Sequence, residues 1–269
     1  MTKPQNDPAR QGRIGVRREG ALGWIVIDNE TRMNALGRSM WEALPQAVAG
    51  LESDREIRVV ILRGAGAQAF SAGADISEFA DQRTGAAAKA YDELNQAAFD
   101  AVTRCTKPTI AMISGFCMGG GFELALCCDL RLAAEGAQFA IPAARLGVGY
   151  NPRWFAPLLA VVSAARLKDL IYTGRRVGHE EAHAGGLLNE VCPGGELEAR
   201  ARALGLEIAA NAPLSILAAK RAIDAHSRAL TDEELTALDE LVEACFDSAD
   251  YAEGQAAFAA KRAPRFKGE

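Results

Sequence analysis

One stretch of sequence predicts most about the fold and the site of this chain. It is residues 113–125, Ile113-Ser-Gly-Phe-Cys-Met-Gly-Gly-Gly-Phe-Glu-Leu-Ala125. The apolar run 109–113 predicts a buried strand, and the residues after the three glycines resemble the first turns of a helix. Glycines let a backbone approach a ligand closely, and the free N–H groups of a first helical turn lie at the positive end of the helix dipole. The stretch therefore predicts a binding site for a developing negative charge.

Glu123 stands three residues after Gly120. On a helix, this spacing places the glutamate side chain and the Gly120 backbone on one face, so that a carboxylate and an amide donor lie side by side. A second glycine-containing loop, residues 69–76, contains Gly73-Ala74 and could supply another N–H from the opposite side. The pattern leaves two alternatives open: glycines that form only a tight turn, and a glutamate that the helix dipole alone favours.

The rest of the sequence predicts an α/β core followed by helices. Alternating strands and helices indicate parallel β-α-β units, which bind ligands at the carboxyl ends of their strands. From residue 154 to 260 nearly every segment has helical periodicity, apart from an apolar run at 187–191. The predicted strands are 14–18, 22–28, 59–62, 109–113 and 129–133, and the clearest helices are 37–51, 85–105, 122–127, 196–210, 213–230, 232–248 and 252–261.

Composition excludes several classes of protein. The chain has 269 residues, 49% of them hydrophobic, as is usual for a globular protein. Its formal net charge of -5 weighs against a nucleic-acid-binding protein. It contains no apolar run long enough for a membrane span, and its three histidines lack metal-binding spacing, so neither a membrane partner nor a metal is expected. Its six cysteines form no CxxC pair, which favours reduced thiols and a cytoplasmic location.

Several ordered motifs resemble those of the enoyl-coenzyme A hydratase/isomerase (crotonase) family, from about residue 14 to the C-terminus. The motifs are Met33-Asn-Ala-Leu36, Phe70-Ser-Ala-Gly-Ala-Asp-Ile76, Lys107-Pro108, Gly115-Phe-Cys-Met-Gly-Gly-Gly-Phe-Glu-Leu-Ala125, Cys128-Asp129, Ala137-Gln-Phe139, Thr173-Gly-Arg175 and Ala184-Gly-Gly-Leu-Leu188. The resemblance implies an α/β crotonase-like ββα spiral core over residues 14–195 and a helical oligomerisation region over residues 196–269. It further implies a homo-trimer or a hexamer formed from two trimers.

The resemblance also assigns the candidate site. Ala74 and Gly120 would donate the two N–H groups of an oxyanion hole, and Glu123 would be the general acid/base. The substrate would be an acyl-coenzyme A thioester, with coenzyme A as part of the substrate and no covalently bound cofactor. The expected substrate-binding residues are Arg32, Ala72, Asp75, Ile76, Phe116 and Tyr150. Arg32 is a candidate for contact with the phosphates of coenzyme A, and the basic cluster Lys261, Arg262, Arg265 and Lys267 is a second one. For both, a solvated surface charge is the alternative.

One position departs from the family pattern. Hydratases of the family use a second glutamate directly after the residue corresponding to Pro142, and this chain has Ala143 there. Alanine cannot transfer a proton, so we expect Glu123 to be the sole acid/base of an enoyl-CoA hydratase. The alternatives are an isomerase, decarboxylase or hydrolase on the same scaffold, and a non-catalytic acyl-CoA-binding protein. A serine peptidase is not expected, because Ser71 has no evident histidine partner.

Overall fold

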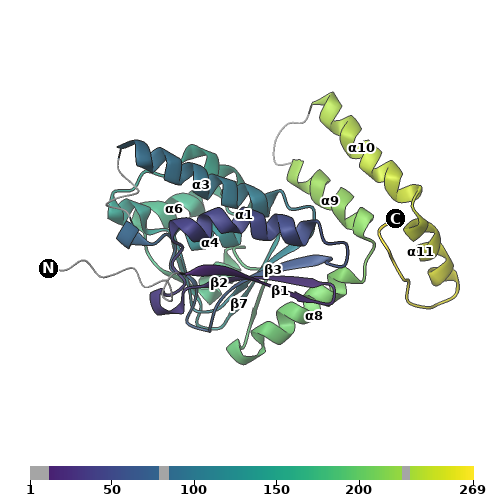
Figure 1. The fold of residues 1–269 in the computed structure, drawn as a ribbon, viewed down its shortest axis with the longest axis horizontal. Coiled ribbons are helices and arrows are strands. Elements are labelled where there is room, and N and C mark those ends of the chain that lie inside the picture. The colour runs from purple at the N-terminus through teal and green to yellow at the C-terminus, as the bar shows by residue number, and fades with distance from the viewer. Residues whose placement is uncertain (1–11, 79–84, 226–230) are drawn as a thin grey trace.

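Two β-sheets form the centre of the molecule (Figure 1). The computed structural model describes residues 12–78, 85–225 and 231–269. A six-stranded sheet has the order β1-β2-β3-β5-β7-β10, and a four-stranded sheet has the order β4-β6-β8-β9. The larger sheet contains β1 (Arg13–Glu19), β2 (Leu22–Asp28), β3 (Val59–Gly64), β5 (Thr109–Ile113), β7 (Leu130–Ala134) and β10 (Glu190–Cys192). The smaller sheet contains β4 (Ala69–Ser71), β6 (Phe116–Met118), β8 (Gln138–Ala140) and β9 (Val177–Gly178).

The predicted strands of the larger sheet are confirmed. β1 and β2 form an antiparallel hairpin in which Glu19 pairs with Leu22 across a turn at Gly20, whose φ is +54°. The other strands of this sheet pair in parallel. All five residues of β5 are buried, as expected for a parallel strand covered on both faces, which explains why this strand is a continuous apolar run in the sequence.

The smaller sheet was not predicted from the sequence. Its strands contain only two or three residues each, too few for a period-two pattern, so the sequence predicts no strand within 69–76 or 114–121. In the structure, each of β3, β5 and β7 continues into a short strand of the second sheet. The repeating unit is therefore strand, strand and helix rather than a simple β-α-β unit.

Helices cover both faces of the larger sheet. α1 and α3 lie together over one face, and α8 lies on the opposite face, where it contacts β2, β3, β5 and β7 (Figure 1). The helices are α1 (Arg38–Glu52), α3 (Gly85–Thr103), α4 (Gly120–Leu126), α5 (Phe155–Val161), α6 (Ala164–Thr173), α7 (His179–Ala184), α8 (Leu197–Ala209), α9 (Pro213–Ala225), α10 (Asp232–Phe246) and α11 (Ala249–Ala259). None of the described helices is long and apolar enough to cross a membrane.

α8 packs on the larger sheet and therefore belongs to the core. The helices beyond the sheet begin with α9. α10 and α11 extend from one end of the molecule (Figure 1). The side chain of Lys220 in α9 is buried, and its ammonium lies 2.8 Å from the carboxylate of Asp129, which connects α9 to the core. The helix expected over 213–230 is confirmed to Ala225, and its last five residues lie outside the described part of the chain.

The cysteines are free thiols, and five of the six are buried in the core. Only Cys245, in α10, is partly exposed. The buried ones therefore act as small apolar side chains, as the sequence predicted.

Candidate active site

A small cavity of about 90 Å³ opens beside the N-terminus of α4. Segments far apart in the sequence border it: the loop after β4, the start of α4, the 3-10 helix η4 (Pro142–Leu146), the segment from Val148 to Trp154, and side chains from α1 and α3. Its lining residues are Trp41, Ala72, Gly73, Ala74, Ile76, Asn95, Phe99, Gly119, Gly120, Glu123, Ile141, Pro142, Ala143, Leu146, Val148, Tyr150 and Trp154. The cavity thus brings together the two glycine-containing segments that the sequence singled out.

The backbone of Ala74 is oriented by its neighbours. The Leu36 N–H donates to the Gly73 carbonyl at 2.8 Å, and the Asp75 N–H donates to the Leu36 carbonyl at 2.9 Å. Successive amides of an extended chain point in opposite directions, so these two bonds turn the Ala74 N–H away from Leu36. Ala74 lines the cavity, and its amide is therefore directed to the side where a ligand would lie.

The amide of Gly120 approaches that of Ala74 closely. Gly120 is the first residue of α4, so its N–H has no partner within the helix. A Cβ placed on Gly120 would lie 3.9 Å from the Ala74 nitrogen, and one placed on Gly73 would lie 3.3 Å from the Gly120 nitrogen. Gly73 has a φ of +93°, and any side chain there would strike the Met118 carbonyl at 2.8 Å. The glycine is therefore required where the two loops meet.

Glu123 is buried in the wall of the same cavity. It lies in the first turn of α4, and its side chain is 1% exposed. The hydroxyl of Tyr150 donates a hydrogen bond to its Oε2 atom at 3.0 Å. A hydrogen bond to a charged carboxylate is stronger than one between neutral groups, and it fixes the orientation of the carboxylate. The cavity therefore holds a positioned carboxylate beside two backbone donors.

Ala143 lines the cavity as well. The residue is buried, at 8% exposure, in η4. The position at which the resemblance in the sequence implies a second glutamate thus lines this cavity, but contributes no proton-transfer group. Glu123 is the only carboxylate among the cavity's described lining residues.

The loop that carries Ala74 is supported by a buried polar network. Ser71 donates its hydroxyl proton to the Asn34 carbonyl at 2.8 Å and accepts from the Gly73 N–H at 3.1 Å. The side chain of Asn34 donates to the carbonyls of Ala65 and Ala69 at 2.9 and 2.7 Å. The Asn-Ala-Leu motif therefore acts at a distance, by holding the loop in place.

Arg32 and Asp75 form an ion pair at 2.6 Å. Burial tends to raise the pKa of Asp75, but hydrogen bonds from Ser77 and Arg32 outweigh it and hold the pKa below its ordinary value. The Arg32 side chain is 53% exposed, so one face of the guanidinium remains open to an anion. Ile76, 67% exposed, lines the mouth of the cavity next to this pair.

Other predicted binding residues lie outside the cavity lining. Phe116 is in β6 and does not line the cavity, and the guanidinium of Arg176 stacks over its ring at 5.3 Å. Arg262, in the basic C-terminal cluster, pairs with Glu253 at 2.7 Å. None of the four cluster residues lines the cavity.

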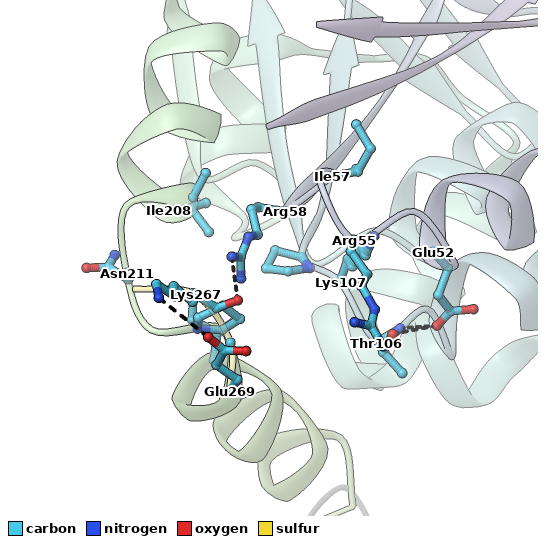
Figure 2. Close-up of a pocket in the computed structure, with 15 residues that line it drawn as sticks. Glu52, Arg55, Ile57, Arg58, Thr106, Lys107, Ile208, Asn211, Lys267 and Glu269 are labelled. Carbon is cyan, nitrogen blue, oxygen red and sulfur yellow. Dashed lines mark hydrogen bonds and ion pairs between the residues drawn. The ribbon is translucent and has the colours of Figure 1, made fainter. Parts of the chain in front are cut away.

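A second cavity, of about 410 Å³, lies at the amino ends of β3 and β5. Figure 2 shows basic side chains of Arg55, Arg58, Lys107 and Lys267 there, together with Glu52 and Glu269. Arg58 already donates to the Lys267 carbonyl at 2.8 Å, and Lys107 to the Leu51 carbonyl at 2.7 Å. Several of its cations thus have partners within the chain, and Lys267 is the one predicted candidate among its described lining residues.

Sequence reasoning missed several residues of the candidate site. Trp41, Asn95, Phe99 and Trp154 all line the cavity. Trp41 and Phe99 occupy the apolar faces of α1 and α3, where they look like ordinary core residues, and their ring centroids lie 5.6 Å apart. Their positions on two different helices became evident only once the helices were placed together.

Comparison with known proteins agrees with this geometry. The family model for enoyl-CoA hydratase/isomerase matches residues 17–269. This chain belongs to that family. It is 32% identical to the short-chain-enoyl-CoA hydratase of Clostridium acetobutylicum, over 92% of this chain and 94% of that protein. It is 34% identical to the carnitinyl-CoA dehydratase of Salmonella typhi, over 95% of this chain and 98% of that protein.

Solved structures show the same fold. An enoyl-CoA hydratase/carnithine racemase from Magnetospirillum magneticum superposes with a TM-score of 0.90 at 40% identity, covering 95% of this chain and 96% of that one. An enoyl-CoA hydratase from Bacillus anthracis superposes with a TM-score of 0.88 at 33% identity, covering 96% and 100%. The crotonase fold predicted from the family motifs is therefore confirmed.

Proposed function

We propose that this chain is an enoyl-CoA hydratase that adds water to a 2-enoyl-CoA thioester. One observation carries the proposal: the buried carboxylate of Glu123 lines the same small cavity as the amides of Ala74 and Gly120. The hydratase names of several relatives support the same reaction.

The proposed reaction uses these groups in order. The thioester carbonyl oxygen accepts hydrogen bonds from the Ala74 and Gly120 N–H groups. Glu123 removes a proton from water as the water oxygen bonds to C3, and the electron pair of the double bond moves toward the carbonyl to give an enolate. Glu123 then returns the proton to C2. Each oxyanion donor contributes about 2.7–4 kcal/mol to stabilising the charge.

The substrate contains coenzyme A as the thiol part of its thioester, which stays intact in the reaction. No separate cofactor takes part. The 90 Å³ cavity fits a short acyl group better than a long one. Arg32, half-exposed and ion-paired with Asp75, is the candidate for contact with the phosphates of coenzyme A. Ala72, Asp75 and Ile76, which follow β4, are candidates for other contacts with the substrate. The six free thiols support a cytoplasmic enzyme.

The C-terminal helices support a homo-trimer, alone or paired into a hexamer. α9, α10 and α11 border an apolar cavity of about 690 Å³ that includes Phe246, Tyr251 and Phe258. Phe258 is 88% exposed in the single chain. Exposed aromatic residues clustered in this way are typical of protein interfaces.

Ala143 favours one alternative. With a single carboxylate in the cavity, Glu123 could instead move a proton between C2 and C4 of an enoyl thioester and act as an isomerase. The two reactions differ in whether a hydroxyl is added. A decarboxylase or hydrolase would release carbon dioxide or free coenzyme A, and a non-catalytic binder would leave the thioester unchanged.

The test compares wild type with Glu123→Gln on crotonyl-CoA, with loss of the conjugated thioester absorbance and product identity as readouts. Wild type should form 3-hydroxybutyryl-CoA. Glu123→Gln should lower kcat by about 10²–10⁴-fold, because it removes the proton-transfer group, while thioester binding by calorimetry stays close to wild type. Equal turnover by both proteins would contradict the assignment of Glu123.

A further inference from the structure

Tyr150 joins the wall of the cavity from which the second carboxylate is missing. The Val148 N–H donates to the Ala143 carbonyl at 3.0 Å, so the chain folds back on itself between these residues. Tyr150, two residues further on, lines the cavity with Ala143 and Glu123. Its hydroxyl reaches Glu123 Oε2 at 3.0 Å. A polar group from the segment that follows Ala143 thus lines the site and contacts Glu123.

Aromatic packing fixes the Tyr150 ring in this place. Its centroid lies 5.3 Å from that of Trp154 in an edge-to-face contact and 5.7 Å from that of Phe155. The side chain of Asn151 accepts a hydrogen bond from the Arg153 N–H at 3.1 Å and begins the 3-10 helix η5 (Pro152–Trp154), which carries Trp154. Such contacts limit the ring to one orientation, with its hydroxyl at the carboxylate.

We infer that Tyr150 replaces the missing second carboxylate and holds the oxygen that adds to C3. A phenol has one proton to donate and two lone pairs that accept. A phenol that donates its proton to a carboxylate can accept one hydrogen of an incoming water through a lone pair. The water's other hydrogen then faces Glu123, which a single carboxylate alone would not ensure.

The protons in this reaction balance with water, Glu123 and the thioester alone. Water gives one proton to Glu123, its oxygen bonds to C3, and Glu123 returns the proton to C2. Tyr150 keeps its own proton throughout and remains in contact with the oxygen, which becomes the 3-hydroxyl of the product. The inference rests on the proposed function, and it makes Tyr150 a catalytic residue that recognises a 3-hydroxyacyl thioester.

The kinetic test is Tyr150→Phe, which keeps the ring and its packing but removes the hydroxyl. We expect kcat on crotonyl-CoA to fall by about 10- to 100-fold, the size of one hydrogen bond to a charged group, with little change in KM. Ala143→Glu added to Tyr150→Phe should recover part of this loss, because it restores a second carboxylate. Tyr172→Phe is the matched control, since Tyr172 is 72% exposed on α6 and should behave as wild type.

A binding test separates this inference from the proposed reaction. In the Glu123→Gln background, which prevents turnover, calorimetry compares 3-hydroxybutyryl-CoA of each configuration with butyryl-CoA. Adding Tyr150→Phe should reduce the preference for one hydroxyl-bearing ligand by about 10-fold. An unchanged preference would overturn the role of Tyr150, even if the wild type hydrates crotonyl-CoA. Absence of hydration by the wild type would refute the proposed function, and the binding result would still decide the role of Tyr150.

Discussion

Single residues decide the chemistry of this site through what they place beside Glu123. A methyl group at Ala143 and a hydroxyl at Tyr150 line the same cavity, so the site has one carboxylate and one phenol among its described lining residues. Glycine positions and helix spacing predicted that Glu123 and the Gly120 amide share one face of a helix, and the family resemblance implied the roles of Glu123, Ala74 and Gly120. The contact between Tyr150 and Glu123 joins residues 27 positions apart in the chain, and no local pattern predicts it.

Gly121 offers a test at this scale. A Cβ placed there would lie 2.5 Å from the Ser71 Cβ and 2.7 Å from its Oγ, so α4 packs against β4 with no space for a methyl group. Gly121→Ala should lower the free energy of unfolding in urea by about 1–3 kcal/mol through overpacking. It should also reduce kcat/KM, because Ser71 holds the loop that carries Ala74.

The matched control for Gly121→Ala is Gly50→Ala. Gly50 lies within α1, and a Cβ there would meet no atom within 4 Å. This change should raise the free energy of unfolding by about 0.5–1 kcal/mol through helix propensity, without an effect on turnover. Equal stabilities of the two variants would show that α4 can move away from β4 at no cost.

At the scale of elements, local pattern predicted the long segments and not the short ones. The strands of the larger sheet and the helices of the core have enough residues for a clear period, and the structure has them within a few residues of the predicted limits. The three-residue strands β4, β6 and β8 show no period in their apolar residues, because pairing with neighbouring strands rather than sequence pattern makes them strands. They matter for the site, since β4 and β6 lead directly into the loops of Ala74 and Gly120.

In the C-terminal helices, too, a local feature was predictable and a tertiary one was not. The Thr231 hydroxyl accepts from the Glu234 N–H and the Glu234 carboxylate accepts from the Thr231 N–H, which is a capping box at the start of α10. That start was predicted near Asp232. The position of α8 on the sheet, by contrast, depends on contacts with four strands, and no helix-start signal reveals it.

At the scale of the whole molecule, the exposed apolar surface of α9 to α11 predicts self-association. Phe258 is more exposed than Phe246 and Tyr251, the other aromatic residues of this surface. Phe258→Glu places a charge there, and burial of that charge against a neighbouring chain would be costly. Light scattering coupled to size exclusion should give three or six times the mass of one chain for the wild type and a smaller species for the variant. Tyr172→Glu, on α6, is the control and should keep the wild-type mass.

A wild-type protein that runs as a single chain at micromolar concentration would contradict this assembly. The variant should retain the helices of the core, because Phe258 is not part of either core cluster. Far-ultraviolet circular dichroism checks that point.

We propose that two peptide amides from separate loops converge on one carbonyl oxygen beside Glu123. The most direct test replaces Ala74 by lactic acid, which exchanges its N–H for an ester oxygen and leaves every side chain in place. The Ala74 N–H is turned away from its strand partner, so the exchange removes the donor with little effect on the fold. We expect kcat on crotonyl-CoA to fall by about 10²–10³-fold while thioester binding is retained. Turnover of the ester protein at the wild-type rate would contradict it.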